Sequence, residues 1–157
     1  MRWACFLMMF LFLGCQQPFY GKQLRLEMSA PQQAVLFRVE NDKTVSYGGG
    51  LDAVEGKTSW HGEMNAQQQV KYIELFAATH WVTNPPSIKK IEGTGHYNIR
   101  IRDDHVDNVF TLPLNDENAT LIYDFLLKVA RVRFEPHLKK LPRANMDVII
   151  DRNKKQK

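Results

Sequence analysis

Residues 35–47 read VLFRVENDKTVSY, and this stretch decides the fold of the chain. Apolar and polar side chains alternate on both sides of Asn41-Asp42, with the period of a β-strand whose two faces differ. Asn and Asp favour turns, because their short polar side chains tolerate the turn conformation. The sequence therefore predicts a β-hairpin over residues 34–48, ended by Gly48-Gly49-Gly50.

The same pattern recurs further along the chain. Tyr97, Ile99 and Ile101 alternate with polar residues, Asp103-Asp104 supplies a turn signal, and an apolar alternation returns up to Leu112. This predicts a second hairpin. Further strands are predicted at residues 58–62 and, as a short edge strand, at residues 24–28.

Two segments have the apolar period of amphipathic helices. The first, residues 66–80, follows Asn65, which has Gln68 three residues later, as in a capping box. The second, residues 116–132, follows Asn115, which is predicted to be its N-cap. The predicted apolar stripes are Val70, Ile73, Phe76, Ala77 and Trp81 in the first helix and Leu121, Ile122, Phe125, Leu126 and Val129 in the second.

This order of elements predicts an α+β fold. We expect an antiparallel sheet of about four to six strands, built from two hairpins, with two amphipathic helices packed on one face. The length of 157 residues suits one such domain, expected at residues 34–133. Residues 15–33 are interpreted as a tether and residues 134–157 as an irregular basic tail, in which Asp147 to Asp151 could add a short strand.

The N-terminus has the features of an export signal. A positive start at Met1-Arg2 precedes an uncharged apolar run, residues 3–13, and then Gly14-Cys15. The run is shorter than the roughly 20 apolar residues that cross a bilayer, so it fits a signal peptide. These residues resemble a bacterial lipoprotein precursor, whose lipobox ends in an invariant cysteine.

This resemblance implies where the protein resides. It implies cleavage between Gly14 and Cys15 and a lipid on the sulfur of Cys15, which holds the protein in the cell envelope on the non-cytoplasmic side of a membrane. Cys5 would leave with the signal, so lipidation would account for the remaining cysteine. Gln16, in place of the Asp that retains such proteins at the inner membrane, favours the outer membrane. An ordinary signal and free secretion are the alternative.

Charge is distributed unevenly along the chain. Residues 131–157 carry nine basic and three acidic side chains, whereas residues 15–130 carry eleven basic and fourteen acidic ones. A basic tail beside a lipid anchor is predicted to contact an anionic membrane surface, and a solvated end is the alternative. Nucleic acid is not expected as a partner of an exported, tethered protein. The tail residues concerned are Lys139, Lys140, Arg143, Arg152, Lys154, Lys155 and Lys157.

Two clusters are candidate binding sites. Carboxylate and imidazole groups can bind a metal ion, so one hypothesis is a metal site, with a solvated hairpin tip as the alternative. Aromatic side chains can anchor a ligand, with core packing as the alternative. The candidate metal ligands are Asp103, Asp104, His105 and Asp107, and the candidate ligand-binding aromatics are Trp60, Trp81 and Tyr97.

Serine in a Gly-x-Ser-x-Gly elbow is absent from the sequence, and no catalytic residue or cofactor is assigned. We therefore expect a non-enzymatic envelope lipoprotein that binds an envelope protein or polymer. The alternatives are a ligand-binding or inhibitory module with an aromatic cleft near Trp60 and Trp81, and a metal-dependent hydrolase. The domain itself resembles uncharacterised secreted bacterial domains, through Trp60-His61-Gly62 and a helix that ends in Trp81, and this likeness implies no activity.

Overall fold

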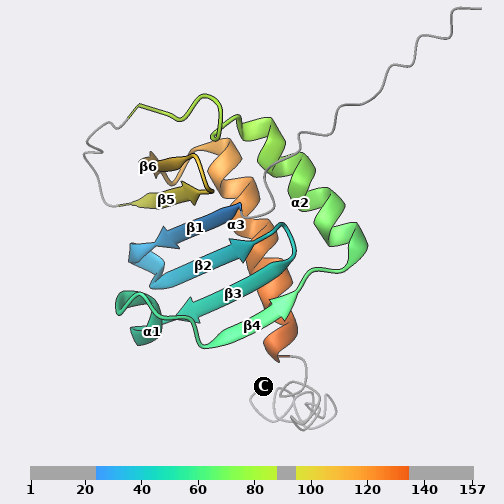
Figure 1. Cartoon of the computed structure of the whole chain (residues 1–157). Coiled ribbons are helices and arrows are strands. Elements are labelled where there is room, and N and C mark those ends of the chain that lie inside the picture. The colour runs from blue at the N-terminus through green and yellow to red at the C-terminus, as the bar shows by residue number, and fades with distance from the viewer. Residues whose placement is uncertain (1–23, 88–94, 135–157) are drawn as a thin grey trace, which may run out of the picture.

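The computed structural model describes residues 24–87 and 95–134 (Figure 1). These residues form a six-stranded antiparallel sheet in the order β4-β3-β2-β1-β5-β6, with helices packed against it. The predicted α+β class is confirmed. The elements are β1 (Arg25–Ala30), the 3₁₀ turn η1 (Pro31–Gln33), β2 (Val35–Glu40), β3 (Thr44–Gly49), α1 (Leu51–Val54), β4 (Trp60–Glu63), α2 (Ala66–Thr79), β5 (His96–Arg102), β6 (Asp107–Pro113), α3 (Glu117–Ala130) and the 3₁₀ turn η2 (Arg131–Phe134).

The strand β1 lies in the middle of the sheet. Met28 pairs with Phe37 of β2 on one side and with Ile99 of β5 on the other. The prediction of an edge strand at residues 24–28 is therefore wrong, and residues 24–33 belong to the folded domain rather than to a tether. Local sequence could not show this, because the second partner of β1 lies about 70 residues further along the chain.

Both predicted hairpins are present. β2 and β3 are joined by a turn in which Asn41 and Asp42 have φ angles of 53° and 54°. Two successive positive φ angles define the type I′ turn, which matches the twist of the flanking strands, and Asn and Asp tolerate this conformation. The amide of Lys43 closes the turn by donating to the carbonyl of Glu40 at 3.1 Å. Burial raises the pKa of the Asp42 carboxyl above its usual value.

The two long helices begin at capped ends. The side chain of Asn65 accepts from the amide of Gln68, whose side chain accepts from the amide of Asn65, both at 2.9 Å, so the predicted capping box is confirmed. The cap of α3 differs from the prediction. Asp116, not Asn115, is the N-cap, and its Oδ1 accepts from the amide of Ala119 at 2.8 Å. A carboxylate also suits the positive end of the helix dipole.

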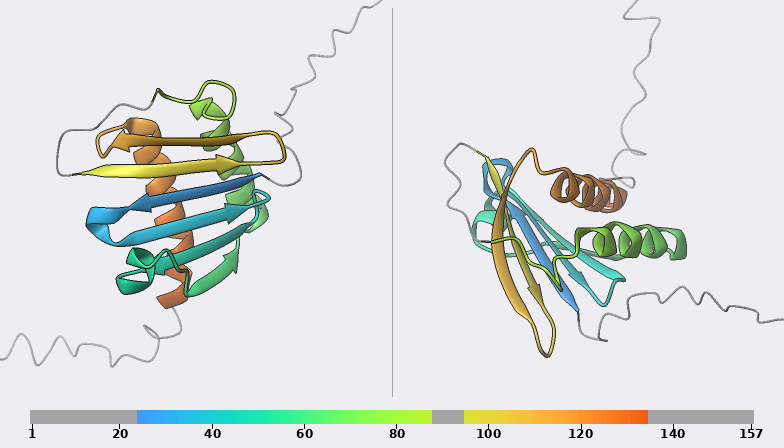
Figure 2. Two further views of the ribbon diagram at one scale, coloured as in Figure 1. Left: turned by 60° about the vertical axis from the view of Figure 1, so that its left-hand side comes forward. Right: turned by 90° about the horizontal axis from the view of Figure 1, so that it is seen from above.

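Helices α2 and α3 cover one face of the sheet, as Figure 2 shows. The core lies between these two layers, and its α3 side comes from Ile122, Leu126 and Val129. Two residues of the predicted stripes are exposed instead, since Val70 is 57% exposed and Leu121 is 47% exposed. The buried positions of α2 are Tyr72, Phe76 and Thr79, so Val70 lies on the side of that helix turned away from the sheet.

The opposite face of the sheet is mostly uncovered. The short helix α1 packs there against β2 and β3 (Figure 2). Leu36 projects to this face and is nevertheless only 3% exposed. The other side chains of this face are largely polar, as the alternation of the strands requires.

Candidate functional site

A groove runs between α2 and α3 on the side of the helix layer away from the sheet. It encloses about 540 Å³. Its side chains come from Asn65 to Leu75, at the start and middle of α2, and from Leu121 to Val129 of α3, because the two helices pack side by side. The groove is lined by Asn65, Gln67, Gln68, Lys71, Leu75, Leu121, Phe125, Lys128 and Val129.

The apolar part of the groove follows from two adjacent ridges on α3. Ile122 and Leu126 are four residues apart and are buried against the sheet. Leu121, Phe125 and Val129 also lie four residues apart, in a row one position before this one, and line the groove, with the core residue Val129, 3% exposed, at its base. Phe125 also stacks on Tyr72 of α2, with ring centroids 6.2 Å apart. The helix pair therefore presents apolar surface to solvent as well as to the core.

The charged side chains that line the groove are both lysines, Lys71 on α2 and Lys128 on α3. None of the nine lining residues is acidic. Lys71 contacts Glu74 at 3.4 Å, but both side chains are more than half exposed, so this pair holds the lysine only weakly. The groove thus combines apolar side chains, three amides and two cations, and it suits a segment with apolar and acidic side chains.

Sequence patterns did not single out this groove. Leu121 and Phe125 were assigned to the apolar stripe of the second helix, while Lys71, Leu75 and Lys128 were not singled out. The signal for the groove is the width of the apolar stripe on α3. The stripe includes the row that faces the sheet and the row that lines the groove, so it is too wide for one buried face.

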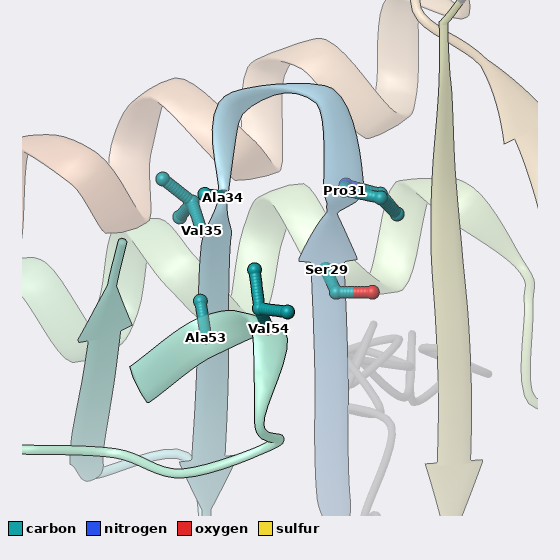
Figure 3. Close-up of a pocket in the computed structure, with 6 residues that line it drawn as sticks. All are labelled: Ser29, Pro31, Ala34, Val35, Ala53 and Val54. Carbon is teal, nitrogen blue, oxygen red and sulfur yellow. The ribbon is translucent and has the colours of Figure 1, made fainter. Parts of the chain in front are cut away.

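A second cavity, of about 410 Å³, lies beside α1 at the end of β1. Figure 3 shows its six lining residues around the η1 turn and α1. Five of them are apolar, and Ser29 provides the one hydroxyl. The lining residue Val54 is 72% exposed, and Leu51, also on α1, is 79% exposed. The cavity carries no charged side chain among its lining residues, so it offers less basis for selecting a partner than the groove does.

Ion pairs cross the strands of the uncovered sheet face. The guanidinium of Arg38 donates to Glu27 at 2.6 Å, and that of Arg100 donates to both oxygens of Asp107 at 2.8 and 2.6 Å. The Asp107 pair lowers the pKa of the Asp107 carboxyl and raises that of Arg100. The side chains of both pairs are between about a third and a half exposed, so water and salt screen the attraction between their charges. These two pairs involve four charged side chains of this face.

Ser46 and His61 form a contact that the sequence did not indicate. They lie opposite each other on β3 and β4, and the Ser46 hydroxyl is 2.8 Å from Nδ1 of His61. A nucleophilic serine needs a histidine that a third group orients. In residues 24–87 and 95–134, no carboxylate accepts a hydrogen bond from His61. We therefore assign this contact to strand pairing.

The three candidate aromatics do not form a common cleft. Trp81 and Tyr97 are each 3% exposed, and Trp81 packs edge-on against Phe110 of β6 at 5.5 Å. Trp60 lies on β4, at the opposite edge of the sheet, and packs against the core. The interpretation of Trp60, Trp81 and Tyr97 as core residues is thus the one that fits their positions, and no ligand site is built from them.

Tyr97 instead belongs to a group of buried rings around Tyr123. The rings of Tyr97 and Phe37 lie 5.3 and 5.6 Å from that of Tyr123, whose hydroxyl donates to Oε1 of Gln33. Burial raises the pKa of Tyr123 to about 12. This contact joins α3 to the η1 turn.

The turn of the second hairpin is stabilised by its own side chains. Asp103 Oδ1 accepts from the amides of His105 and Val106, both at 2.7 Å, and Asp107 is paired with Arg100. Among the described residues, no group of three or more His, Cys, Asp or Glu side chains is placed to hold a metal ion. Asp103, Asp104, His105 and Asp107 therefore fit a solvated hairpin tip.

Other predictions fall outside the described residues. These include the signal and the lipidation site, Gly14 and Cys15, and every basic tail residue from Lys139 to Lys157. None of the helices formed by residues 24–87 and 95–134 is long and apolar enough to cross a membrane. No protein-family model matches the chain, and neither does any curated protein.

Proposed function

We propose that this protein is a membrane-anchored envelope lipoprotein whose domain binds another envelope protein through the groove between α2 and α3. The observation that carries this proposal is the groove itself, an apolar depression of about 540 Å³ with a lysine on each helix. Paired helices that expose apolar side chains commonly receive an amphipathic segment of a partner.

The charge of the groove defines the chemistry of the partner. Lys71 and Lys128 favour carboxylates, and Leu75, Leu121 and Phe125 favour aliphatic side chains. A partner segment with apolar residues flanked by Asp or Glu satisfies both. The lipid on Cys15 would confine this recognition to a membrane surface, where tethering raises the effective concentration of the two proteins.

Site-specific photocrosslinking in the producing cell tests this function. A photoreactive amino acid at Leu121, which is 47% exposed, should form a crosslink to a partner protein. The same amino acid at Thr111, on the uncovered face of the sheet, is the matched control and should not form that crosslink. Lys71→Glu with Lys128→Glu should remove it, because both cations of the groove become anions.

The tether is tested separately. Intact-mass measurement of the mature protein should give a chain that begins at a lipid-modified Cys15, and Cys15→Ala should leave the chain unprocessed. Equal crosslinking from Leu121 and Thr111, or a crosslink unaffected by the lysine changes, would contradict binding at the groove. A mature chain without lipid would contradict the anchor alone.

A further inference from the structure

The groove has an acidic, apolar counterpart in this chain. Residues 147–151 read DVIID, three aliphatic residues between two aspartates. We infer that this segment occupies the groove between α2 and α3 in the free protein, so that a partner must displace it. The inference rests on the groove of the proposed function and adds an occupant.

Charge distinguishes this segment from the stretches on either side of it, residues 136–146 and 152–157. Residues 136–146 contain His137, Lys139, Lys140 and Arg143 but no acidic residue, and residues 152–157 contain four basic residues and no acidic one. Both stretches would place cations beside Lys71 and Lys128. Asp147 and Asp151 instead bring one carboxylate for each lysine.

The chain is long enough to reach the groove. Lys128 and Val129 line it, and α3 ends one residue later at Ala130, so the C-terminal chain starts next to the groove. Twelve residues lie between Phe134 and Asp147, and the thirteen steps from one to the other allow a span of up to about 43 Å. The whole of α3, with 14 residues, is about 21 Å long. The linker can therefore place the segment anywhere along the groove.

The composition of the segment fits the lining of the groove. Val148, Ile149 and Ile150 are uncharged and branched, and Leu121 and Phe125 are the apolar side chains they would cover. Because both partners belong to one chain, binding does not depend on protein concentration, and weak contacts suffice.

The full chain, purified in detergent with a benzoylphenylalanine at position 149, tests the inference. Irradiation at low protein concentration should join residue 149 to peptides of α2 or α3 in the same chain, as located by mass spectrometry. The same photoreactive residue at position 138 is the control, since Leu138 lies among the basic residues, and it should give about tenfold less of this crosslink.

A charge swap provides the second measurement. Lys71→Glu with Lys128→Glu should reduce the crosslink from position 149 about tenfold, and Asp147→Lys with Asp151→Lys in that background should restore it. Far-ultraviolet circular dichroism verifies that each variant is folded. Crosslinks to β4, crosslinks only between two chains, or no effect of the swap would overturn the inference. If position 149 gives no crosslink to the groove, the crosslink from Leu121 to a partner in cells can still form. The two experiments therefore test the two proposals separately.

Discussion

Replacing Met28 with alanine tests the interior position of β1. The Met28 side chain is 0% exposed and lies between Phe37 on β2 and Ile99 on β5. Truncating a buried methionine removes favourable transfer from water and leaves a cavity, which together cost about 2–5 kcal/mol. The free energy of unfolding of a domain is about 5–15 kcal/mol, so this loss is a large share of it.

Urea unfolding followed by tryptophan fluorescence measures the effect, since Trp81 is buried in the same core. With a slope of about 1.5 kcal/mol per molar urea, a loss of about 3 kcal/mol lowers the midpoint by about 2 M. Ser29→Ala is the matched control, because Ser29 is the next residue of β1 and faces the other side of the sheet, and it should cost less than about 0.5 kcal/mol. Equal shifts for the two variants would refute the placement of β1 in the core of the sheet.

Three further changes have defined outcomes. Asp116→Ala should lower the free energy of unfolding by about 1 kcal/mol, because α3 loses its N-cap, whereas Asn115→Ala should not. The urea midpoints of the two variants measure the difference, and equal losses would contradict Asp116 as the cap. Asp42→Gly should raise the thermal midpoint by about 2 °C, because glycine adopts the positive φ of 54° without strain, and a lower midpoint would count against this turn geometry. Since burial raises the pKa of Tyr123 from 10.0 to about 12, the unfolded chain loses this proton first, and the stabilisation by the neutral phenol is complete below pH 10.0 and lost as the pH rises through about 12. Tyr123→Phe should flatten the pH dependence of the free energy of unfolding in that window. An unchanged slope would mean that other groups cause the pH dependence.

The two hairpins and the two long helices could be predicted because their signals are local. Asn41-Asp42 between alternating strands predicts a turn, and Asn65 with Gln68 predicts a capping box, each within four residues of sequence. The cap of α3 was misplaced by one residue, since Asn115 and Asp116 are both good N-caps and only the backbone conformation decides between them. The short helix α1 lacks a recognisable period, and the sequence did not predict it.

The groove could not be predicted in the same way. An apolar residue on a helix is equally compatible with the core and with an exposed ridge until the rotation of that helix against its neighbours is known. Leu121 and Ile122 are adjacent and apolar, yet Leu121 is 47% exposed and Ile122 is 0% exposed. The same uncertainty affected Trp81 and Tyr97, for which ligand binding and core packing were both open from the sequence and which are each 3% exposed.

The sequence by itself determined the strand alternation, the turns, the first helix cap and the α+β class, because each depends on contacts between residues close together in the chain. Only the tertiary structure decided that β1 is central, that Trp60 and Trp81 lie at opposite edges of the sheet, and that Lys71 and Lys128 share a groove. These features depend on pairings between distant segments, such as β1 with β5. Such pairings are set by burial of the whole core and not by any local pattern.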